Sequence, residues 1–287
     1  MPQRHPRTGR RAGRPPARTP LVVRGAEAWS ADPPAGPGDG PRVGVLVLHG
    51  FTGSPASVLP WAHALADAGL AVAVPRLPGH GTDVRDLDRT TWRDWYSLAR
   101  ADLQQLRDRC DVTLVAGLSM GGALALRLAV HERDLVDGVA VVNPAVLLGD
   151  PRLVALPVLR LLRRTVPGVA DDIAMPGRTE LGYDAVPLRA LTSFLGLMAE
   201  VRRDLPLVTQ PTLVASSPQD HLIPPESSRV VRAGLGSADV RDVRLERSYH
   251  VATLDHDFPL VVEETLRLVH DVVDGRTATT PVAGVPA

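Results

Sequence analysis

The residues GLSMGG, at positions 117–122, place one serine among three glycines directly after the apolar run VTLVAG. That run predicts a β-strand over 112–117, and ALALRLAVHE (123–132) predicts a helix immediately afterwards. A sharp strand–turn–helix connection leaves no room for side chains beside the turn, and Gly117 and Gly121 meet that need. Ser119 is therefore expected in a strained turn at the N-terminus of a helix, as a candidate nucleophile.

Similar apolar runs recur along the chain and alternate with helical patterns. The runs are VGVLVL (43–48), LAVAVP (70–75), GVAVVN (138–143), TLVASS (212–217) and the more alternating, edge-like DVRLER (242–247). This alternation predicts an α/β fold with a mostly parallel central sheet and helices on both faces. Ser54-Pro55 predicts the start of one helix, and Thr91 to Arg109 predicts another.

The alternation is interrupted at about 145–207, which predicts a small helical cap inserted over the carboxyl ends of the strands. We expect a single α/β domain over 21–273 that includes this cap. Residues 1–20 hold six arginines and no acid and are expected to form a disordered basic tail, without the apolar segment of a signal peptide. Residues 274–287 are expected to form a second disordered tail.

Composition excludes several kinds of chemistry. Formal net charge is zero, which gives no indication of a nucleic-acid partner. The chain contains no lysine, so a serine–lysine dyad and a Schiff base are excluded. Its single cysteine, Cys110, excludes a disulfide framework and fits a reduced, cytoplasmic location. The single cysteine also excludes a cysteine-rich metal site.

An activated serine needs an imidazole base and a carboxylate that orients the base. Asp220 follows the run TLVASS, and His250 follows DVRLER, so both are expected at the carboxyl edge of the sheet, where Ser119 lies. His221 is a rival base, but as the sequence neighbour of Asp220 it would point away from a shared site. The pattern predicts a Ser119–Asp220–His250 triad.

Acyl transfer also needs amide donors for the oxyanion of the tetrahedral intermediate. The amide of Met120, directly after the serine, is one candidate. The loop HGFTGSP (49–55) follows an earlier strand and offers the amide of Phe51 as the other. His49 is expected to orient this loop rather than to take part in the reaction.

The insertion contains two apolar helical segments, LVALPVLRLLRRTV (153–166) and LTSFLGLMAEV (191–201). Their apolar positions fit either ordinary core packing or contact with an acyl chain. The arginines of the first segment leave open a transient contact with an anionic membrane or micelle surface.

Taken together, the chain resembles the bacterial carboxylesterase and monoacylglycerol lipase family of α/β-hydrolases over roughly residues 21–273. The resemblance is carried by GAEAWSAD (25–32), HGFTGSP, PRLPGHGT (75–82), the tryptophan pair of TTWRDW, GLSMGG, DHLIPP (220–225) and SYHVATLD (248–255). It implies the same triad, the same two oxyanion amides, and neither a metal nor an organic cofactor. It also implies that Glu180, in RTELGYD (178–184), contacts the glycerol part of a substrate.

These expectations favour a serine hydrolase that cleaves a monoacylglycerol to glycerol and a fatty acid through an acyl-enzyme on Ser119. A short-chain carboxylesterase or a thioesterase is the alternative within enzymes, and a non-catalytic ligand-binding module is the alternative outside them. The expected partner is a small lipid ester. A monomer and a homodimer both remain open.

Overall fold

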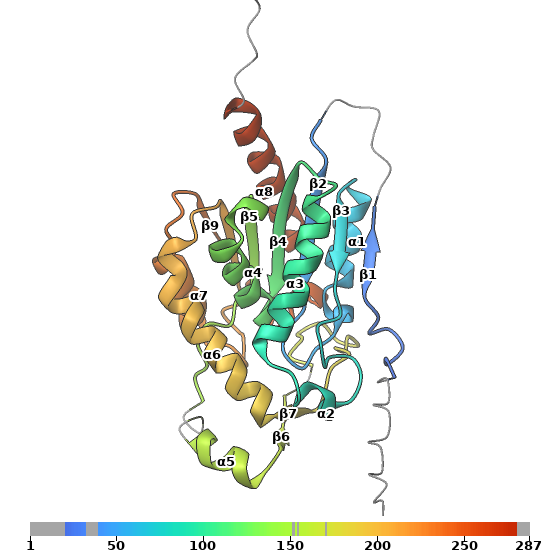
Figure 1. Cartoon of the computed structure of the whole chain (residues 1–287), viewed down its shortest axis with the longest axis vertical. Helices are drawn as coiled ribbons and strands as arrows, with labels where there is room; N and C mark the ends of the chain where they lie inside the picture. Colours follow the sequence, from blue (N-terminus) through green and yellow to red (C-terminus); the bar gives the residue numbers. More distant parts are fainter. Residues whose placement is uncertain (1–20, 33–39, 151–152, 154, 170, 280–287) are drawn as a thin grey trace, which may run out of the picture.

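The computed structural model describes residues 21–32, 40–150, 153, 155–169 and 171–279. Its centre is a seven-stranded sheet in the order β1-β3-β2-β4-β5-β8-β9 (Figure 1). The strands are β1 (Trp29–Ala31), β2 (Val43–Leu48), β3 (Ala71–Val74), β4 (Val112–Leu118), β5 (Gly138–Val142), β8 (Thr212–Ser216) and β9 (Val240–Arg244). Strand β1 pairs antiparallel with β3, and the other neighbours pair in parallel. The predicted α/β, mostly parallel sheet is confirmed.

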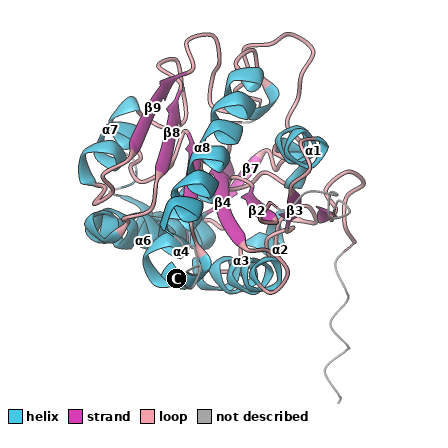
Figure 2. Ribbon diagram, turned by 90° about the horizontal axis from the view of Figure 1, so that it is seen from above, coloured by secondary structure: helices cyan, strands magenta, loops and turns pink. Residues whose placement is uncertain are grey.

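Helices cover both faces of the sheet, as Figure 2 shows. On one face lie α3 (Trp92–Arg107), α4 (Met120–His131), α6 (Leu188–Asp204) and α7 (Pro225–Gly234), and on the other lie α1 (Leu59–Asp67) and α8 (Phe258–Thr279). Short elements are α2 (Val84–Leu87) and the 3-10 turns Pro55–Ser57, Arg133–Leu135, Leu205–Leu207 and Ala252–Leu254. Every residue of β2 and β4 is buried, because each of these strands is covered on both faces.

The sequence predicted one of the two edge strands of the sheet but not the other. Strand β9 is half-exposed and lies at one edge, as its alternating sequence predicted. The opposite edge strand, β1, was not predicted, since three partly exposed residues carry too little pattern to indicate a strand.

Helix starts are confirmed in one case and corrected in another. Helix α3 begins after Thr91, whose side chain and that of Asp94 form a reciprocal capping box. Ser54, predicted as a helix N-cap, makes no capping bond; Pro55 instead opens a single 3-10 turn before α1. The Ser54 hydroxyl donates to the carbonyl oxygen of Leu181 at 2.7 Å, so a contact with the insertion replaces the local cap.

The insertion lies beyond the carboxyl ends of the strands, at the bottom of Figure 1. It contains α5 (Leu156–Leu162) and a small antiparallel pair, β6 (Thr165–Pro167) and β7 (Ala185–Pro187). Helix α6 packs against α3 and α4 on the face of the sheet. The part that stands over the strand ends is therefore smaller than the whole of 145–207, because α6 also serves as the crossover from β5 to β8.

The end of the chain differs from expectation. Helix α8 continues through Thr279, so residues 274–279 are helical rather than disordered. A contact of 3.1 Å between His270 Nδ1 and Asp274 Oδ2, one turn apart, accompanies this extension. Residues 1–20 and 280–287, predicted as tails, lie outside the described residues. Within the described chain, no helix combines the length and the apolarity that crossing a membrane requires.

Candidate active site

Ser119 lies between β4 and α4 in a conformation that non-glycine residues rarely adopt, with φ 57° and ψ −114°. The two flanking glycines make this turn possible. A Cβ built on Gly117 would lie 2.3 Å from the carbonyl carbon of Gly121, and one built on Gly121 would lie 2.1 Å from the carbonyl oxygen of Leu48. Both positions therefore require glycine, and the backbone strain at Ser119 is held by close packing.

The glycine-rich loop after β2 passes directly over the serine. A Cβ built on Gly50 would lie 3.5 Å from Ser119 Cβ and 4.0 Å from Ser119 Oγ. Phe51, the next residue, lines the same cavity as Ser119. Met120 is the first residue of α4, where an amide has no carbonyl partner within the helix. The two predicted oxyanion amides thus come from segments that flank Ser119.

His49 connects this loop to the loop after β3. Its Nδ1 donates to the carbonyl oxygen of Gly50 at 2.9 Å, and its Nε2 accepts from the amide of Leu77 at 3.2 Å. Burial lowers the pKa of His49 to about 4, so the ring is neutral at pH 7. His49 orients the loop, as the sequence indicated.

His250 and Asp220 form a buried hydrogen-bonded pair. His250 Nδ1 lies 2.7 Å from Asp220 Oδ2, and the other carboxylate oxygen accepts the amides of Leu222 and Ile223 at 2.8 and 2.7 Å. Burial of His250 by itself lowers the pKa of the imidazole. The charge and hydrogen bond of Asp220, with smaller contributions from Glu180 and Asp172, outweigh that effect and raise the pKa.

Asn143, which sequence reasoning missed, binds the loop over residues 245–251 that carries His250, called the histidine loop below. It has φ 45° at the end of β5, and its Nδ2 donates to the carbonyl oxygen of His250 at 2.8 Å. Its Oδ1 accepts the amide of Ser217 at 2.7 Å, which joins the ends of β5 and β8 to the histidine loop. The available signal was a polar residue at the carboxyl end of the buried run GVAVVN.

His221, the rival base, does not line the cavity that holds Ser119. Its side chain is 60% exposed, and its Nδ1 lies 2.7 Å from Asp172 Oδ1 in the insertion. His250, by contrast, lines the cavity together with Ser119.

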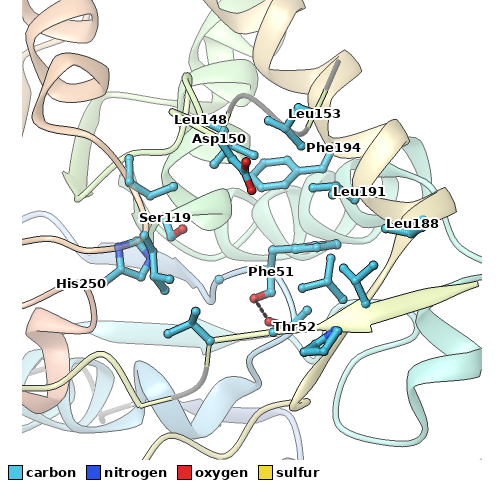
Figure 3. Close-up of a pocket in the computed structure, with 18 of the residues that line it drawn as sticks. Phe51, Thr52, Ser119, Leu148, Asp150, Leu153, Leu188, Leu191, Phe194 and His250 are labelled. Atoms are coloured by element: carbon cyan, nitrogen blue, oxygen red, sulfur yellow. Dashed lines mark hydrogen bonds between the residues drawn. The ribbon is translucent and has the colours of Figure 1, made fainter. Parts of the chain in front are cut away.

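The cavity has a volume of about 540 Å³, within the usual range for small-molecule sites. Ser119 and His250 lie on one side of it, and the apolar side chains of Leu188, Leu191 and Phe194 from α6 lie on the other (Figure 3). The insertion completes the lining with Leu153, Leu156, Leu159, Val166, Val169 and Val186. The polar side chains of the lining are those of Thr52, Ser119, Asp150, Glu180 and His250. A chamber that is otherwise mostly apolar suits a ligand with a long hydrocarbon part.

Glu180 is the acidic residue that the insertion brings to the lining nearest His250. A Cβ built on Gly53 would lie 2.6 Å from its Oε1, so the carboxyl group packs on the glycine-rich loop. Withdrawal of this carboxyl from water raises its pKa, although the charge of His250 acts in the opposite direction.

The segment that carries Glu180 is attached to the body of the protein by several hydrogen bonds. Tyr183 donates its amide to the carbonyl oxygen of Thr52 at 2.9 Å and its hydroxyl to that of Gly79 at 2.7 Å. Together with the Ser54–Leu181 contact, these bonds join the end of the insertion to the loops after β2 and β3.

Asp255, in the predicted motif SYHVATLD, makes a corresponding attachment on the other side of the site. Its buried carboxylate accepts the amides of Ala174 and Met175 from the insertion at 2.7 and 3.0 Å, and that of Tyr249 at 2.9 Å.

Among the residues that the structure describes, no group of three or more His, Cys, Asp or Glu side chains could hold a metal ion.

Comparisons with known proteins agree with this geometry. Residues 45–264 match the alpha/beta hydrolase family. The chain is 39% identical over 250 residues to a thermostable monoacylglycerol lipase of a Bacillus strain, covering 85% of this chain and 94% of the relative. It is 26% identical over 223 residues to a carboxylesterase of Bacillus subtilis, covering 77% and 89%.

Among solved structures, one from a study of two metagenome-derived lipolytic enzymes is 37% identical, with a TM-score of 0.82. That match covers 88% of this chain and 100% of the other. The family match spans most of the sheet and reaches from the glycine-rich loop to the histidine loop. The chain belongs to the alpha/beta hydrolase family.

Proposed function

We propose that the protein is a serine hydrolase of carboxylic esters, with Ser119 as nucleophile, His250 as general base and acid, and Asp220 as the carboxylate that orients His250. One observation carries this proposal. A strained serine and a buried, hydrogen-bonded histidine–aspartate pair line the same apolar cavity. The match to the alpha/beta hydrolase family supports it further.

In the reaction that we infer, Ser119 Oγ attacks the ester carbonyl carbon while His250 Nε2 takes the hydroxyl proton. The tetrahedral intermediate collapses, and the alcohol leaves with the proton from His250. Water then attacks the acyl-enzyme, gives a proton to His250, and the fatty acid departs as the serine regains its proton. Asp220 keeps the Nδ1 proton in place, since its oxygen lies 2.7 Å from that nitrogen.

The developing oxyanion is assigned to the backbone amides of Phe51 and Met120. Both residues flank Ser119, and the N-terminal end of α4 favours negative charge at this point. Each such donor contributes about 3–4 kcal/mol to transition-state stabilisation.

A monoacylglycerol is the substrate that we favour. The lining is mostly apolar and rich in leucine, which fits an acyl chain. Glu180 supplies a hydrogen-bonding group close to His250, where the alcohol would leave. The Bacillus relative at 39% identity is named a monoacylglycerol lipase, which supports the same substrate class.

A substrate comparison tests this assignment. The wild-type enzyme is expected to prefer 1-monooleoylglycerol to p-nitrophenyl acetate, measured by fatty-acid and nitrophenol release. Glu180→Ala is expected to lower kcat/KM for the monoglyceride by about tenfold, because one hydrogen-bonding partner of the glycerol is lost. Turnover of p-nitrophenyl acetate, which has no glycerol, is expected to change little. Equal losses on both esters would contradict a role in binding the alcohol.

We further infer that the insertion contacts a lipid surface through α5. Three large apolar side chains of this helix are more than 60% exposed, namely Val158, Leu161 and Leu162, and Val169 is exposed nearby. Arg160, Arg163 and Arg164 lie exposed beside them. Exposed apolar side chains bordered by arginines are typical of a surface that binds an anionic membrane or micelle.

A vesicle-binding measurement tests this surface. The double variant Leu161→Ser/Leu162→Ser is expected to bind phosphatidylglycerol vesicles at least about tenfold more weakly, because each leucine contributes roughly 1.5–3 kcal/mol when buried. Leu207→Ser, an exposed leucine beyond the far end of α6, is the matched control and is expected to bind like wild type. Equal vesicle binding by all three proteins would contradict the assignment.

A further inference from the structure

The insertion supplies a second buried carboxylate next to the catalytic histidine. Asp172 is 7% exposed, and its Oδ2 accepts the backbone amide of His250 and that of His221, each at 3.1 Å. Its Oδ1 lies 2.7 Å from His221 Nδ1. The carboxylate thus bridges the loop that carries the base and the loop that carries Asp220.

The backbone of Asp172 extends the same attachment. Its carbonyl oxygen accepts the amide of Val251 at 3.1 Å, so side chain and main chain together bind two consecutive residues of the histidine loop. Asp255, which follows the histidine loop, in turn accepts the backbone amides of Ala174 and Met175. Residues 172–175 are therefore fixed against the histidine loop rather than resting loosely on it.

This arrangement has a specific mechanical effect. His250 and Asp220 come from separate loops, and their 2.7 Å hydrogen bond depends on the spacing between these loops. Because Asp172 binds His250 and the residue after Asp220 through one carboxylate oxygen, it determines that spacing directly. A buried carboxylate without these donors would be costly, which keeps the three groups together.

Electrostatics act in the same direction as geometry. The carboxylates whose charges reach His250 are Asp220, Glu180 and Asp172, and all three favour the imidazolium and raise its pKa against the effect of burial. The exposed His221 imidazole is the other titratable side chain in contact with Asp172, with Nδ1 2.7 Å from Oδ1.

We propose that Asp172 is a positioning residue for the reaction, through which the insertion aligns His250 with Asp220 and stabilises the imidazolium that forms when Ser119 gives up its proton. This inference rests on the proposed serine-hydrolase function. It assigns to the insertion a part in the catalytic step in addition to lining the cavity.

The test compares Asp172→Asn, which keeps the shape and removes the charge, with Asp67→Asn on the exposed end of α1. For each protein, kcat, KM and the pH profile of kcat/KM are measured on a soluble p-nitrophenyl ester. A fluorophosphonate titration counts the competent sites, and thermal melting reports folding. Asp67→Asn is expected to match wild type throughout.

For Asp172→Asn, kcat per titrated site is expected to fall about 10- to 100-fold with KM nearly unchanged, since misalignment affects the transition state more than binding. The acidic limb of the profile reports His250 in the free enzyme. Loss of a negative charge makes imidazolium less favourable, so this limb is expected to move to lower pH. The shift is a readout that a purely structural role would not produce.

Two results would overturn the inference. One is a kcat within about twofold of wild type. The other is a fall in activity explained entirely by fewer titrated sites and a lower melting temperature, with the acidic limb unmoved. If wild type itself hydrolyses no ester, the proposed function fails instead. NMR titration of the His250 ring in wild type and Asp172→Asn then tests the inference alone, with an equal pKa in both proteins as the contradicting result.

Discussion

Replacement of Ser119 by alanine is expected to reduce kcat for ester hydrolysis by about 10⁵- to 10⁶-fold, because the acyl-enzyme can no longer form. The fold should be unaffected, since the Ser119 side chain makes no capping bond to α4. Hydrolysis of p-nitrophenyl butyrate measures the loss, and covalent labelling by a fluorophosphonate should disappear with it.

The control for this variant is Ser97→Ala. Ser97 is exposed on α3, and its hydroxyl donates to the carbonyl oxygen of Arg93 within the same helix. Full activity and full labelling are expected. Substantial ester hydrolysis by Ser119→Ala would remove the serine-nucleophile mechanism. If the wild-type protein hydrolyses none of the esters, a non-catalytic ligand-binding module is favoured instead.

Gly121→Ala is expected to destabilise the protein by about 3 kcal/mol or more, a drop in melting temperature of roughly 6–12 °C for a chain of this size. The added Cβ would lie 2.1 Å from the carbonyl oxygen of Leu48 and 2.8 Å from that of His49. These are backbone atoms of the central strand β2 and its following loop, so neither can move away without disturbing the sheet. Thermal unfolding followed by circular dichroism measures the change.

The matched control makes the same chemical change at Gly196, inside α6. There a Cβ would meet Trp92 Nε1 at 3.7 Å, which is ordinary van der Waals contact. Gly196→Ala is expected to raise stability by about 0.5–1 kcal/mol, because alanine loses less backbone entropy on forming a helix. If both variants destabilise alike, the close packing around Gly121 is not the cause.

Much of the sheet and of the candidate site was predictable from local pattern. Strands covered on both faces are continuous apolar runs, which is why β2 and β4 could be recognised in VGVLVL and VTLVAG. Since parallel strands end at one edge, residues just after those runs could be expected to meet there. His250 and Asp220 were indicated in this way, and their side chains lie 2.7 Å apart in the structure.

The long-range hydrogen bonds of Asp172 and Asn143 were not predicted. Asp172 and Asn143 act by bonding backbone groups of distant loops, and such contacts carry no spacing rule in the sequence. Ser54 shows the reverse error, because its local context indicated a cap while its hydroxyl bonds Leu181, 127 residues away. The length of α8 was underestimated because the sequence near Gly275 resembles a helix end, yet the helix continues.

The bonds from Tyr183 and Leu181 to the loops after β2 and β3 limit how the cavity can open. The segment of the insertion that leads into α6, which contains Leu181 and Tyr183, is bonded to the same loop that supplies Phe51. It cannot move outward without distorting that loop. We therefore expect any opening movement of the insertion to occur on the α5 side. Contact of α5 with a lipid surface would then act on how substrate enters the cavity, while the loop that supplies Phe51 stays in place.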